Sequence, residues 1–480
     1  MTTDPAGFAI DLPSGQLPAK GWDTGPTGRA LRDAAEQSLG GSSFAGGLSI
    51  ALAGEDGLLW AATLGFSDIA SRREVTAATL FEIGSISKSF TSVLLLQARD
   101  AGLLDLDDPV KEHLPWFEVR SRFRPISLRD LLTHTGGIIS GTDFSGESTF
   151  EVWSLRETEA TVEPGTWFHY SNVGYKALGL VLEAVHREPY HAVLRERLMR
   201  PLGMAESEPS ISHETRRRLA VGYEPFYDDR VPRREDGLVP ATWVETSSAD
   251  GSIAATARDM AAWLRFFITG GLGESRMHLL GTSSVEEMLS PVIASDEPGF
   301  SYGLGVNISD VDGHRYVSHG GGMIGYHAHL ACDLDGGAGA IVLANGDGPW
   351  RELAFHALAA LRAERTGAPA PVFGLPPPTR EIPVTEEEPE QWALPFVGHY
   401  RTYNPWCSNL RVYWHQSSLW ASYAMDDVAQ DAPLIRLPDG SYRLGNDERS
   451  PERLRFGPII DGKAVRVTLS GCALYRTFTP

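Results

Sequence analysis

Apolar positions along the chain follow two periods, and these periods predict which segments fold as helices and which as strands. Apolar side chains that recur about every three to four residues predict helices. The segments with this period are 30–39, 89–102, 174–187, 256–271 and 350–367. A further short helix is predicted after Ser127, which has the residue type of an N-cap, and another should end at Pro201, Leu202 and Gly203.

Apolar runs bounded by turn residues predict strands on both sides of this helical region. They cover residues 47–54 and 57–66 before it, and 302–309, 314–321 and 326–345 after it. The last run contains Asp-Gly-Gly at its centre and therefore predicts a hairpin. Because helices lie between early and late strands, we predict a mixed α/β (α+β) core with an antiparallel sheet and a helical subdomain.

The pattern changes after the last helix, where the chain becomes rich in proline and then in glutamate. This composition without a hydrophobic period is typical of an extended spacer. Beyond it, short alternating runs at even spacing predict a small all-β barrel or sandwich. We therefore expect an irregular N-terminal segment over 1–25, a main domain over 26–366, a linker over 367–391 and a β domain over 392–480.

The net charge of the chain and its cysteines indicate which partners to expect and in which cellular compartment the protein lies. Acidic residues outnumber basic ones by 62 to 42, a net charge of −20, so we expect no nucleic acid and no membrane as partner. Cys332, Cys407 and Cys472 are far apart and lack metal-ligand spacing, which favours free thiols in a reducing compartment. The first residues lack the pattern of a signal peptide and no apolar run has the length of a membrane helix, so a cytoplasmic location is expected.

The segment FEIGSISKSF places a serine and a lysine at the start of a predicted helix. Ser85 and Lys88 are three positions apart, so they share one helical face and can reach each other. The positive end of the helix dipole favours a seryl alkoxide and disfavours the lysine cation, which suits a nucleophile with its base. Alone, this S-x-x-K pattern is more often a capping serine followed by a solvated lysine.

Two other segments supply groups of matching chemistry: Tyr170 and Asn172 in FHYSNVGY, and His319, Gly320, Gly321 and Gly322 in YVSHGGGM. A phenol beside a lysine can shuttle a proton, and an amide can orient that lysine or donate to a substrate carbonyl. Glycines at a strand end let a backbone approach a ligand and present N–H groups to an oxyanion. Taken alone, each of these two segments is better explained by a structural role, as a buried tyrosine or as a glycine turn. The three segments together, with Ser85 and Lys88, are much less expected by chance than any one of them.

This set of three motifs resembles the serine β-lactamase and penicillin-binding-protein superfamily, and specifically its class C-like CubicO branch. The segments LLTHTGGI, MRPLGM, GSIAATARDMAAWL, YGLGV and IVLANGDG also match that branch. The resemblance covers about residues 30–365 and implies a β-lactamase/transpeptidase-like fold. The C-terminal β segment resembles the lipocalin-like barrel that some members carry.

The resemblance implies a role for each matching residue. Ser85 attacks a carbonyl group and becomes acylated, and Lys88 and Tyr170 take its proton and return it to the leaving group. His319 stands where many relatives have lysine, and it would hydrogen-bond the tyrosine or contact a substrate carboxylate. The substrate-binding residues implied are Asn172, Gly320 and Gly321, and the oxyanion hole is formed by the backbone N–H groups of Ser85 and Gly322. No metal and no organic cofactor are implied.

These roles predict a serine hydrolase whose partner is a small-molecule acyl or peptide substrate. His319 in place of lysine weakens the case for a β-lactam, and Asn172 favours peptide-like substrates over simple esters. A D-aminopeptidase-like peptidase and a carboxylesterase both remain open, as do an acyltransferase or peptide cyclase and a weak β-lactamase. A catalytically silent peptide-binding module is the alternative of another class. The oligomeric state is left open, and a homo-oligomer is compatible with the sequence.

Some other features are expected to be structural. His134 is interpreted as a hydrogen-bonding residue of the scaffold. The aromatic residues of the β domain are interpreted as its core rather than as a ligand platform: Trp406, Tyr413, Trp414, Trp420 and Tyr423. A sharper hypothesis is that the β domain covers the mouth of the active site and selects small substrates.

Overall fold

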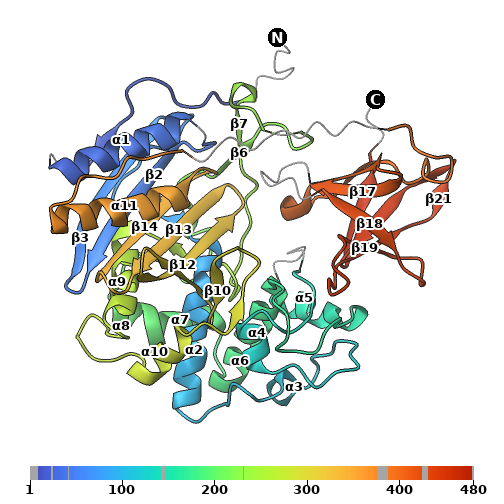
Figure 1. The fold of residues 1–480 in the computed structure, drawn as a ribbon, viewed down its shortest axis with the longest axis horizontal. Coiled ribbons are helices and arrows are strands. Elements are labelled where there is room, and N and C mark those ends of the chain that lie inside the picture. The colour runs from blue at the N-terminus through green and yellow to red at the C-terminus, as the bar shows by residue number, and fades with distance from the viewer. Residues whose placement is uncertain are drawn as a thin grey trace.

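The computed structural model describes residues 9–22, 25–41, 43–141, 147–230, 232–375, 387–423 and 431–477. Its centre is an antiparallel sheet in the order β1-β3-β2-β14-β13-β12-β11-β10-β9, with β4 paired to β3 (Figure 1). The strands are β1 Ala19–Lys20, β2 Gly47–Gly54, β3 Gly57–Asp68, β4 Arg73–Glu74, β9 Ile293–Ala294, β10 Phe300–Tyr302, β11 Asn307–Val311, β12 His314–Met323, β13 Tyr326–Asp333 and β14 Ala338–Ala344. The early strand β2 pairs with the late strand β14, which confirms the predicted antiparallel sheet.

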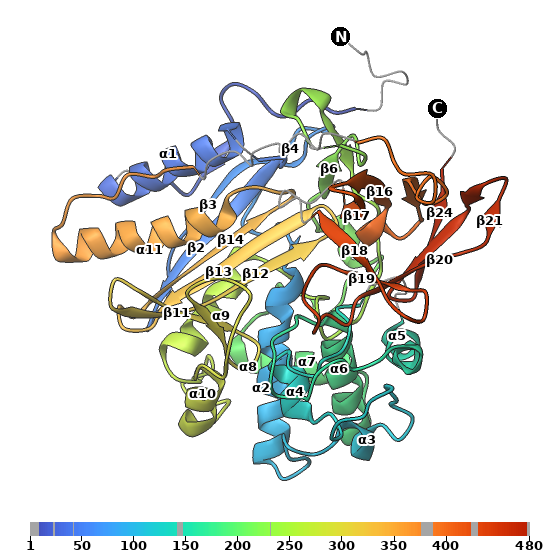
Figure 2. The ribbon, with the colours of Figure 1, turned by 45° about the vertical axis from the view of Figure 1, so that its right-hand side comes forward.

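Both faces of this sheet are buried, because side chains alternate between them along each strand. Leu48, Ile50 and Leu52 of β2 pack on one face against two helices, α1 (Pro26–Gly41) and α11 (Trp350–Thr366). Ala51 and Ala53 face the other side, where α9 (Ala257–Ile268) lies. Figure 2 shows α1 and α11 side by side along one face of the sheet. The strands β2 and β14 are therefore buried throughout.

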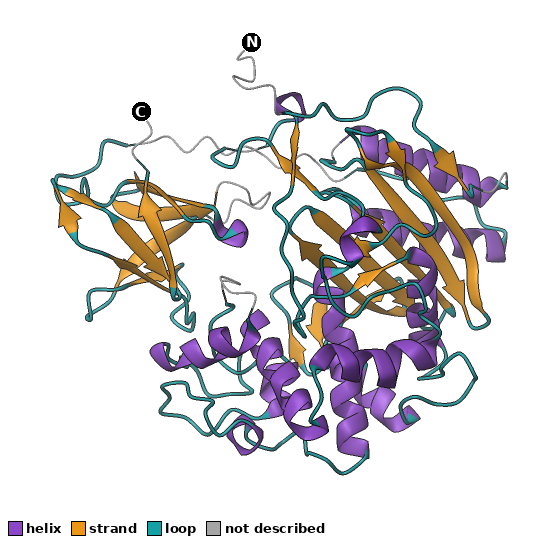
Figure 3. Ribbon diagram, turned by 180° about the vertical axis from the view of Figure 1, so that it is seen from behind, coloured by secondary structure: helices purple, strands orange, loops and turns teal. Residues whose placement is uncertain are grey.

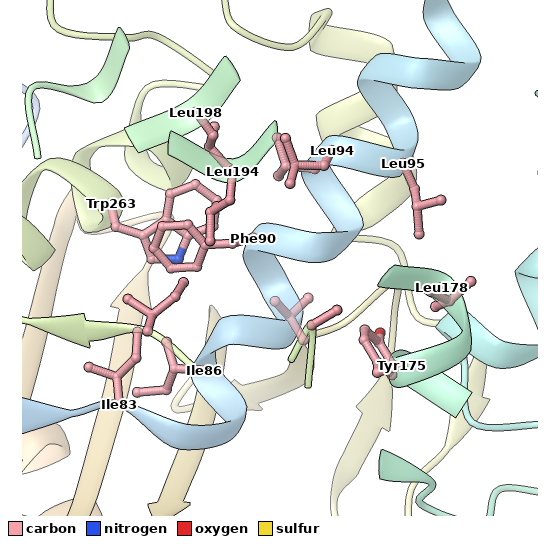
Figure 4. Packing of buried hydrophobic residues seen from close by; sticks show 14 of the residues in the cluster. Ile83, Ile86, Phe90, Leu94, Leu95, Tyr175, Leu178, Leu194, Leu198 and Trp263 are labelled. Carbon is pink, nitrogen blue, oxygen red and sulfur yellow. The ribbon is translucent and has the colours of Figure 1, made fainter. Parts of the chain in front are cut away.

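A helical subdomain lies between the early and late strands, as predicted. Its central helix is α2 (Ser87–Asp100), in which Phe90 stacks on Trp263 of α9 with ring centroids 3.8 Å apart (Figure 4). The other helices are α3 Val110–His113, α4 Leu128–Leu132, α5 Ser148–Ser154, α6 Asn172–His186, α7 Tyr190–Leu194, α8 Arg200–Leu202 and α10 Thr282–Met288. Ser127 caps α4 as predicted, because its side chain accepts from the N–H of Asp130.

Short elements complete this part of the chain. Two-stranded pairs are formed by β5 (Phe81–Glu82) with β8 (Ala254–Ala255), and by β6 (Tyr223–Pro225) with β7 (Leu238–Pro240). The short 3-10 and π turns here are η1 Gly84–Ile86, η2 Leu155–Glu157, η3 Arg195–Met199, η4 Thr215–Arg217 and η5 Arg234–Asp236, and a further one, η6 Pro405–Cys407, lies in the C-terminal domain. These elements connect the larger ones and, at η1, begin the segment that carries Ser85.

The C-terminal domain is a closed barrel of eight strands, so of the two predicted architectures the barrel is confirmed. Its strands are β15 Gly398–Arg401, β16 Asn409–His415, β17 Ser418–Tyr423, β18 Ala432–Arg436, β19 Tyr442–Leu444, β20 Arg453–Phe456, β23 Arg466–Leu469 and β24 Cys472–Arg476, and the pair β21 Ile459–Ile460 and β22 Lys463–Ala464 lies outside the barrel. Closure of the barrel removes exposed strand edges, at which strands of other chains could otherwise pair. Figure 3 shows this strand-built domain beside the helix-rich half of the molecule.

The structure differs from the sequence-based expectations in three places. Residues 302–309 do not form one strand, because Gly305 has a φ of +81° and separates β10 from β11. The N-terminal segment expected to be irregular contributes β1, which pairs with β3. Trp414 belongs to the buried core of the barrel as expected, but Tyr413 is buried outside that cluster, Trp420 is only partly buried and Trp406 is 37% exposed. The side chain of Tyr423 lies outside the described residues.

The structure also tests the expectations of free cysteines and of no membrane-spanning helix. Cys332, Cys407 and Cys472 are all free thiols, as their spacing predicted, and all three are also buried. Among the residues that the structure describes, every helix is too short or too polar to cross a membrane.

Candidate active site

Ser85 and Lys88 are held together at the start of α2. The chain leaves β5, turns at Gly84 with a φ of +51° and enters η1 and then α2, so that both side chains lie on one face. The amine nitrogen Nζ of Lys88 lies 3.0 Å from Ser85 Oγ in a hydrogen bond. This is the distance at which an amine can take the hydroxyl proton, and it agrees with the spacing argument from the sequence.

The lysine side chain is completely buried. Lys88 Nζ donates a hydrogen bond to the carbonyl oxygen of Asp250 at 2.9 Å. It also lies 4.9 Å from the ring centroid of Tyr170 and 5.6 Å from that of Tyr175. Two aromatic rings and a carbonyl therefore surround the amine and fix its direction towards Ser85.

Tyr170 and Asn172 enter the site from the beginning of α6. Ser171, between them, is the N-cap of this helix, and its side chain accepts from the N–H of Gly174. The backbone N–H of Ser171 donates to Nδ1 of His134 at 2.9 Å, and that of Asn172 donates to the carbonyl of Ser140 at 2.8 Å. The loop from His134 to Ser140 thus holds the Tyr-Ser-Asn segment through its backbone.

His134 has the scaffold role that the sequence analysis gave it, and it also contacts the site. Its ring is tilted against that of Tyr170, with ring centroids 4.1 Å apart. Its side chain is almost completely buried, and this burial, with smaller contributions from Lys88 and two other histidines, lowers the pKa of His134 well below its ordinary value. Because the Nδ1 atom accepts a hydrogen bond, the neutral ring carries its proton on Nε2.

His319 lies on β12 and is buried, with 4% of its surface exposed. Burial lowers the pKa of His319 to about 4, and the nearby Lys88 also lowers it. The imidazole is therefore neutral at pH 7. Its Nε2 atom lies 3.1 Å from the hydroxyl of Tyr302, and its ring centroid lies 6.4 Å from that of Tyr170.

Glycines allow β12 to approach the segment that carries Ser85. A Cβ atom on Gly321 would lie 1.9 Å from the carbonyl oxygen of Ile83, and one on Gly84 would lie 2.5 Å from that of Gly322. Only glycine permits these distances. Gly322 itself is exposed, and a Cβ added to it would meet nothing within 4 Å. The backbone of Gly322 is thus placed beside Ser85 and faces open space.

Three of the predicted residues line a small cavity of about 70 Å³, whereas Lys88, Tyr170 and His319 do not line it. Ser85, Asn172 and Gly322 line it together with Asp250 and Met323, and Trp406 of the C-terminal barrel lies on its wall. A larger cavity of about 420 Å³ shares two lining residues with it, Lys176 and Thr246. The ammonium of Lys176 forms a buried ion pair with Glu151.

Some residues of this site were not found from the sequence. Asp250 contributes through its backbone carbonyl, which no residue pattern reveals, and Tyr302 lies in the YGLGV segment that matched the family without a stated role. Trp406 comes from a different domain, so no spacing could relate it to Ser85. Within the described residues, no group of three or more His, Cys, Asp or Glu side chains could hold a metal ion.

Comparison with known proteins gives relatives for most of the chain. A model of the Beta-lactamase family matches residues 32–364. A D-aminopeptidase of Brucella anthropi is 30% identical over 302 residues, 61% of this chain and 54% of that protein, so the chain spans about half the length of this relative. Penicillin-binding protein 4 of Amycolatopsis lactamdurans is 28% identical over 286 residues, 57% of this chain and 74% of that protein.

A solved structure also resembles the chain over both domains. It is that of an octameric penicillin-binding protein homologue from Pyrococcus abyssi, with a TM-score of 0.60 and 22% sequence identity. The likeness covers 90% of this chain and 96% of that one. At this identity it shows the fold alone.

Proposed function

The chain belongs to the Beta-lactamase family, and from this premise we propose that it is a serine hydrolase that forms an acyl-enzyme on Ser85. The observation that carries the proposal is the distance of 3.0 Å between Lys88 Nζ and Ser85 Oγ. The family membership and the relatives named D-aminopeptidase and penicillin-binding protein support it.

Acylation begins with attack of Ser85 Oγ on the substrate carbonyl carbon. Burial favours the neutral form of an amine, and a neutral Lys88 takes the hydroxyl proton as the new C–O bond forms. Tyr170, whose ring lies beside the amine, joins this proton transfer. The protonated group then gives its proton to the leaving amine or alcohol as the bond to the leaving group breaks. Attack of water on the acyl-enzyme reverses these steps and releases the acid.

The oxyanion formed during attack needs two hydrogen-bond donors. We assign this role to the backbone N–H groups of Ser85 and Gly322, because both residues line the cavity and the glycines bring β12 against η1. Preorganised backbone donors of this kind contribute about 3–4 kcal/mol each to transition-state stabilisation. Asn172, on the same wall, orients the acyl side of the substrate through its amide.

The substrate class proposed is a small peptide-like amide or an ester with a compact acyl group. The cavity at Ser85 has a volume of only about 70 Å³, which favours small acyl groups. Because His319 is neutral at pH 7, it supplies no fixed positive charge for the carboxylate of a β-lactam. The relative named D-aminopeptidase favours a D-aminoacyl amide as the first substrate to try.

Acyl transfer is the second candidate, and the neighbouring cavity favours it. That cavity, of about 420 Å³, meets the first at Lys176 and Thr246 and leaves room for an acceptor larger than water. An amine bound there could attack the acyl-enzyme in place of water. Adding hydroxylamine or a D-amino acid amide and quantifying the acylated product against the acid separates transfer from hydrolysis.

The proposal is tested first by covalent labelling of the nucleophile. A fluorophosphonate or penicillin-type probe should add its mass to the wild-type protein, and Ser85→Ala should stay unlabelled. The absence of a mass shift in the wild type, or an equal shift in Ser85→Ala, would contradict the proposed hydrolase. A panel of p-nitrophenyl esters, D- and L-aminoacyl anilides and nitrocefin, compared by kcat/KM, then assigns the substrate class.

Two properties of the whole protein stay proposals. A cytoplasmic location is supported by the three free cysteines, and cell fractionation tests it. A homo-oligomer is supported by the relative from Pyrococcus abyssi, which is described as octameric. Analytical ultracentrifugation of the full chain decides between a monomer and an assembly.

A further inference from the structure

A carboxylate of the C-terminal barrel packs against the segment that carries Tyr170 and Asn172. Glu452 precedes β20, and its side chain is 19% exposed. Its Oε1 atom accepts the backbone N–H of Ser140 at 2.7 Å and lies 3.0 Å from Nε2 of His169. Both partners belong to the catalytic domain. Within the barrel, the hydroxyl of Ser470 donates to the other oxygen, Oε2.

Each of the two partners in the catalytic domain is directly connected to a candidate site residue. The carbonyl of Ser140 accepts the N–H groups of Asn172 and Val173, at 2.8 and 3.2 Å. His169 is the residue before Tyr170, and its own N–H donates to the carbonyl of His134 at 2.8 Å. One carboxylate oxygen thus ties together the loop at Ser140 and the residue before Tyr170, which both hold the Tyr-Ser-Asn segment.

The chemistry of these contacts favours a charged carboxylate. Burial raises the pKa of Glu452, but hydrogen bonds from His169, the Ser140 amide and Ser470 outweigh it, and the net pKa lies below the ordinary value. An ionised acceptor makes shorter and stronger hydrogen bonds than a neutral one. Glu452 can therefore restrain its two partners more firmly than a neutral side chain.

We propose that Glu452 is a positioning residue, through which the barrel holds Tyr170 and Asn172 in place for the reaction at Ser85. This inference rests on the proposed hydrolase function and adds to it a role for the barrel in catalysis. Glu452 does not touch the substrate in this scheme. It acts through His169 and Ser140, so its removal should displace groups that take part in the transition state more than groups that bind the substrate.

The barrel contacts the catalytic domain at a second place, which supplies a matched control. Near the β6–β7 hairpin, Arg401 forms an ion pair with Asp228 at 2.7 Å, and Asn409 donates to the carbonyl of Asp228 at 3.0 Å. This contact fastens the barrel without touching the Tyr-Ser-Asn segment. Glu448 is a second control, because it is an exposed carboxylate in the same loop as Glu452.

The test compares variants of the full chain with p-nitrophenyl acetate as substrate. We expect Glu452→Leu to lower kcat about tenfold to a hundredfold, as small misplacements of catalytic groups do, with KM changed less than about twofold. Glu452→Gln keeps the shape and one acceptor oxygen but loses the charge, so it should restore part of the activity and lower kcat about threefold to tenfold. Arg401→Leu and Glu448→Gln should keep the wild-type kcat.

The outcomes separate this inference from the proposed function. A wild-type protein that fails to label at Ser85 contradicts the hydrolase itself. If the wild type is active and folded Glu452→Leu keeps the wild-type kcat, only the positioning role is overturned. An equal loss of kcat in Arg401→Leu also overturns it, because kcat would then depend on docking of the barrel as a whole and not on Glu452. If circular dichroism shows that Glu452→Leu is unfolded, folded Glu452→Gln decides, and a wild-type kcat in it overturns the proposal.

Discussion

Trp406 of the C-terminal barrel and Ser85 of the catalytic domain line the same cavity of about 70 Å³. The barrel therefore forms part of the wall around the candidate nucleophile, as the hypothesis of a covering β domain requires. Figure 1 shows the two domains beside each other, with the barrel next to α5 and the β6–β7 hairpin. We therefore expect both domains together to limit the size of the substrate.

The first prediction concerns this wall. Replacing the indole in Trp406→Ala enlarges the cavity, so bulky acyl groups should react faster while short ones change little. Each added methylene in such a pocket changes specificity by about 1–3 kcal/mol, and we expect kcat/KM for p-nitrophenyl octanoate to rise about tenfold relative to the acetate. Tyr403→Ala, at a fully exposed side chain of the same loop, is the control. An unchanged octanoate-to-acetate ratio would show that the indole does not limit the acyl group.

The second prediction concerns the buried amine. Lys88→Met removes the proposed base while keeping the volume of the side chain, so the acylation rate should fall by about 10²–10⁴-fold. The folded protein should become more stable, because a buried polar group at a functional site is replaced by an apolar one. Lys176→Met is the contrast. It leaves the carboxylate of Glu151 buried without its ion-pair partner, and we expect it to destabilise the fold by about 3–5 kcal/mol.

Both effects are measured on the same samples, by stopped-flow acylation with a fluorophosphonate and by urea unfolding. A Lys88→Met protein that acylates at the wild-type rate would remove this lysine from the mechanism. A Lys88→Met protein that is strongly destabilised would instead give the lysine a structural role.

The third prediction concerns the approach of β12 to η1. In Gly321→Ala, the added Cβ would lie 1.9 Å from the carbonyl oxygen of Ile83, so β12 must move away and take the N–H of Gly322 with it. Loss of one oxyanion donor lowers kcat by about 10²–10³-fold. Gly320→Ala is the steric comparison, because its Cβ would meet His329 at an ordinary contact distance of 3.6 Å. Equal losses in the two variants would contradict this account.

The sequence predicted the parts of the site that depend on local spacing. Ser85 and Lys88 share a helical face because they are three residues apart, and the structure places their side chains in contact. The glycines after His319 were expected to let the backbone approach a ligand, and in the structure Gly321 packs on the backbone of Ile83. The antiparallel sheet also followed from local patterns, since each strand could be recognised by its own apolar run.

The parts that the sequence did not reveal depend on tertiary contacts between distant segments. Trp406 and Glu452 reach the catalytic domain only because the barrel is closed and docked there, and neither lies in a motif. The contact of His319 Nε2 with the hydroxyl of Tyr302 likewise joins residues of two different strands, β12 and β10. Periodicity identifies elements, but not which side chain of one domain faces another domain.

The last prediction concerns pH. The pKa of His319 is about 4 in the folded protein, against an ordinary value of 6.5, because burial disfavours the imidazolium. Between these two values the unfolded chain binds a proton that the folded one does not, so stability is fully present above pH 6.5 and is lost as the pH falls towards 4. For this group the loss amounts to about 3 kcal/mol.

His319→Gln isolates the contribution of this group from that of the other buried histidines, such as His329, whose pKa burial lowers to about 3. The free energy of unfolding is measured by urea titration at pH 7 and at pH 4. We expect its decrease between these two pH values to be about 3 kcal/mol smaller in the variant than in the wild type. His213→Gln, at an exposed histidine, should follow the wild-type curve. Parallel curves for the wild type and His319→Gln would mean that His319 is not held neutral by the fold, and the argument against a fixed charge at this position would then fail.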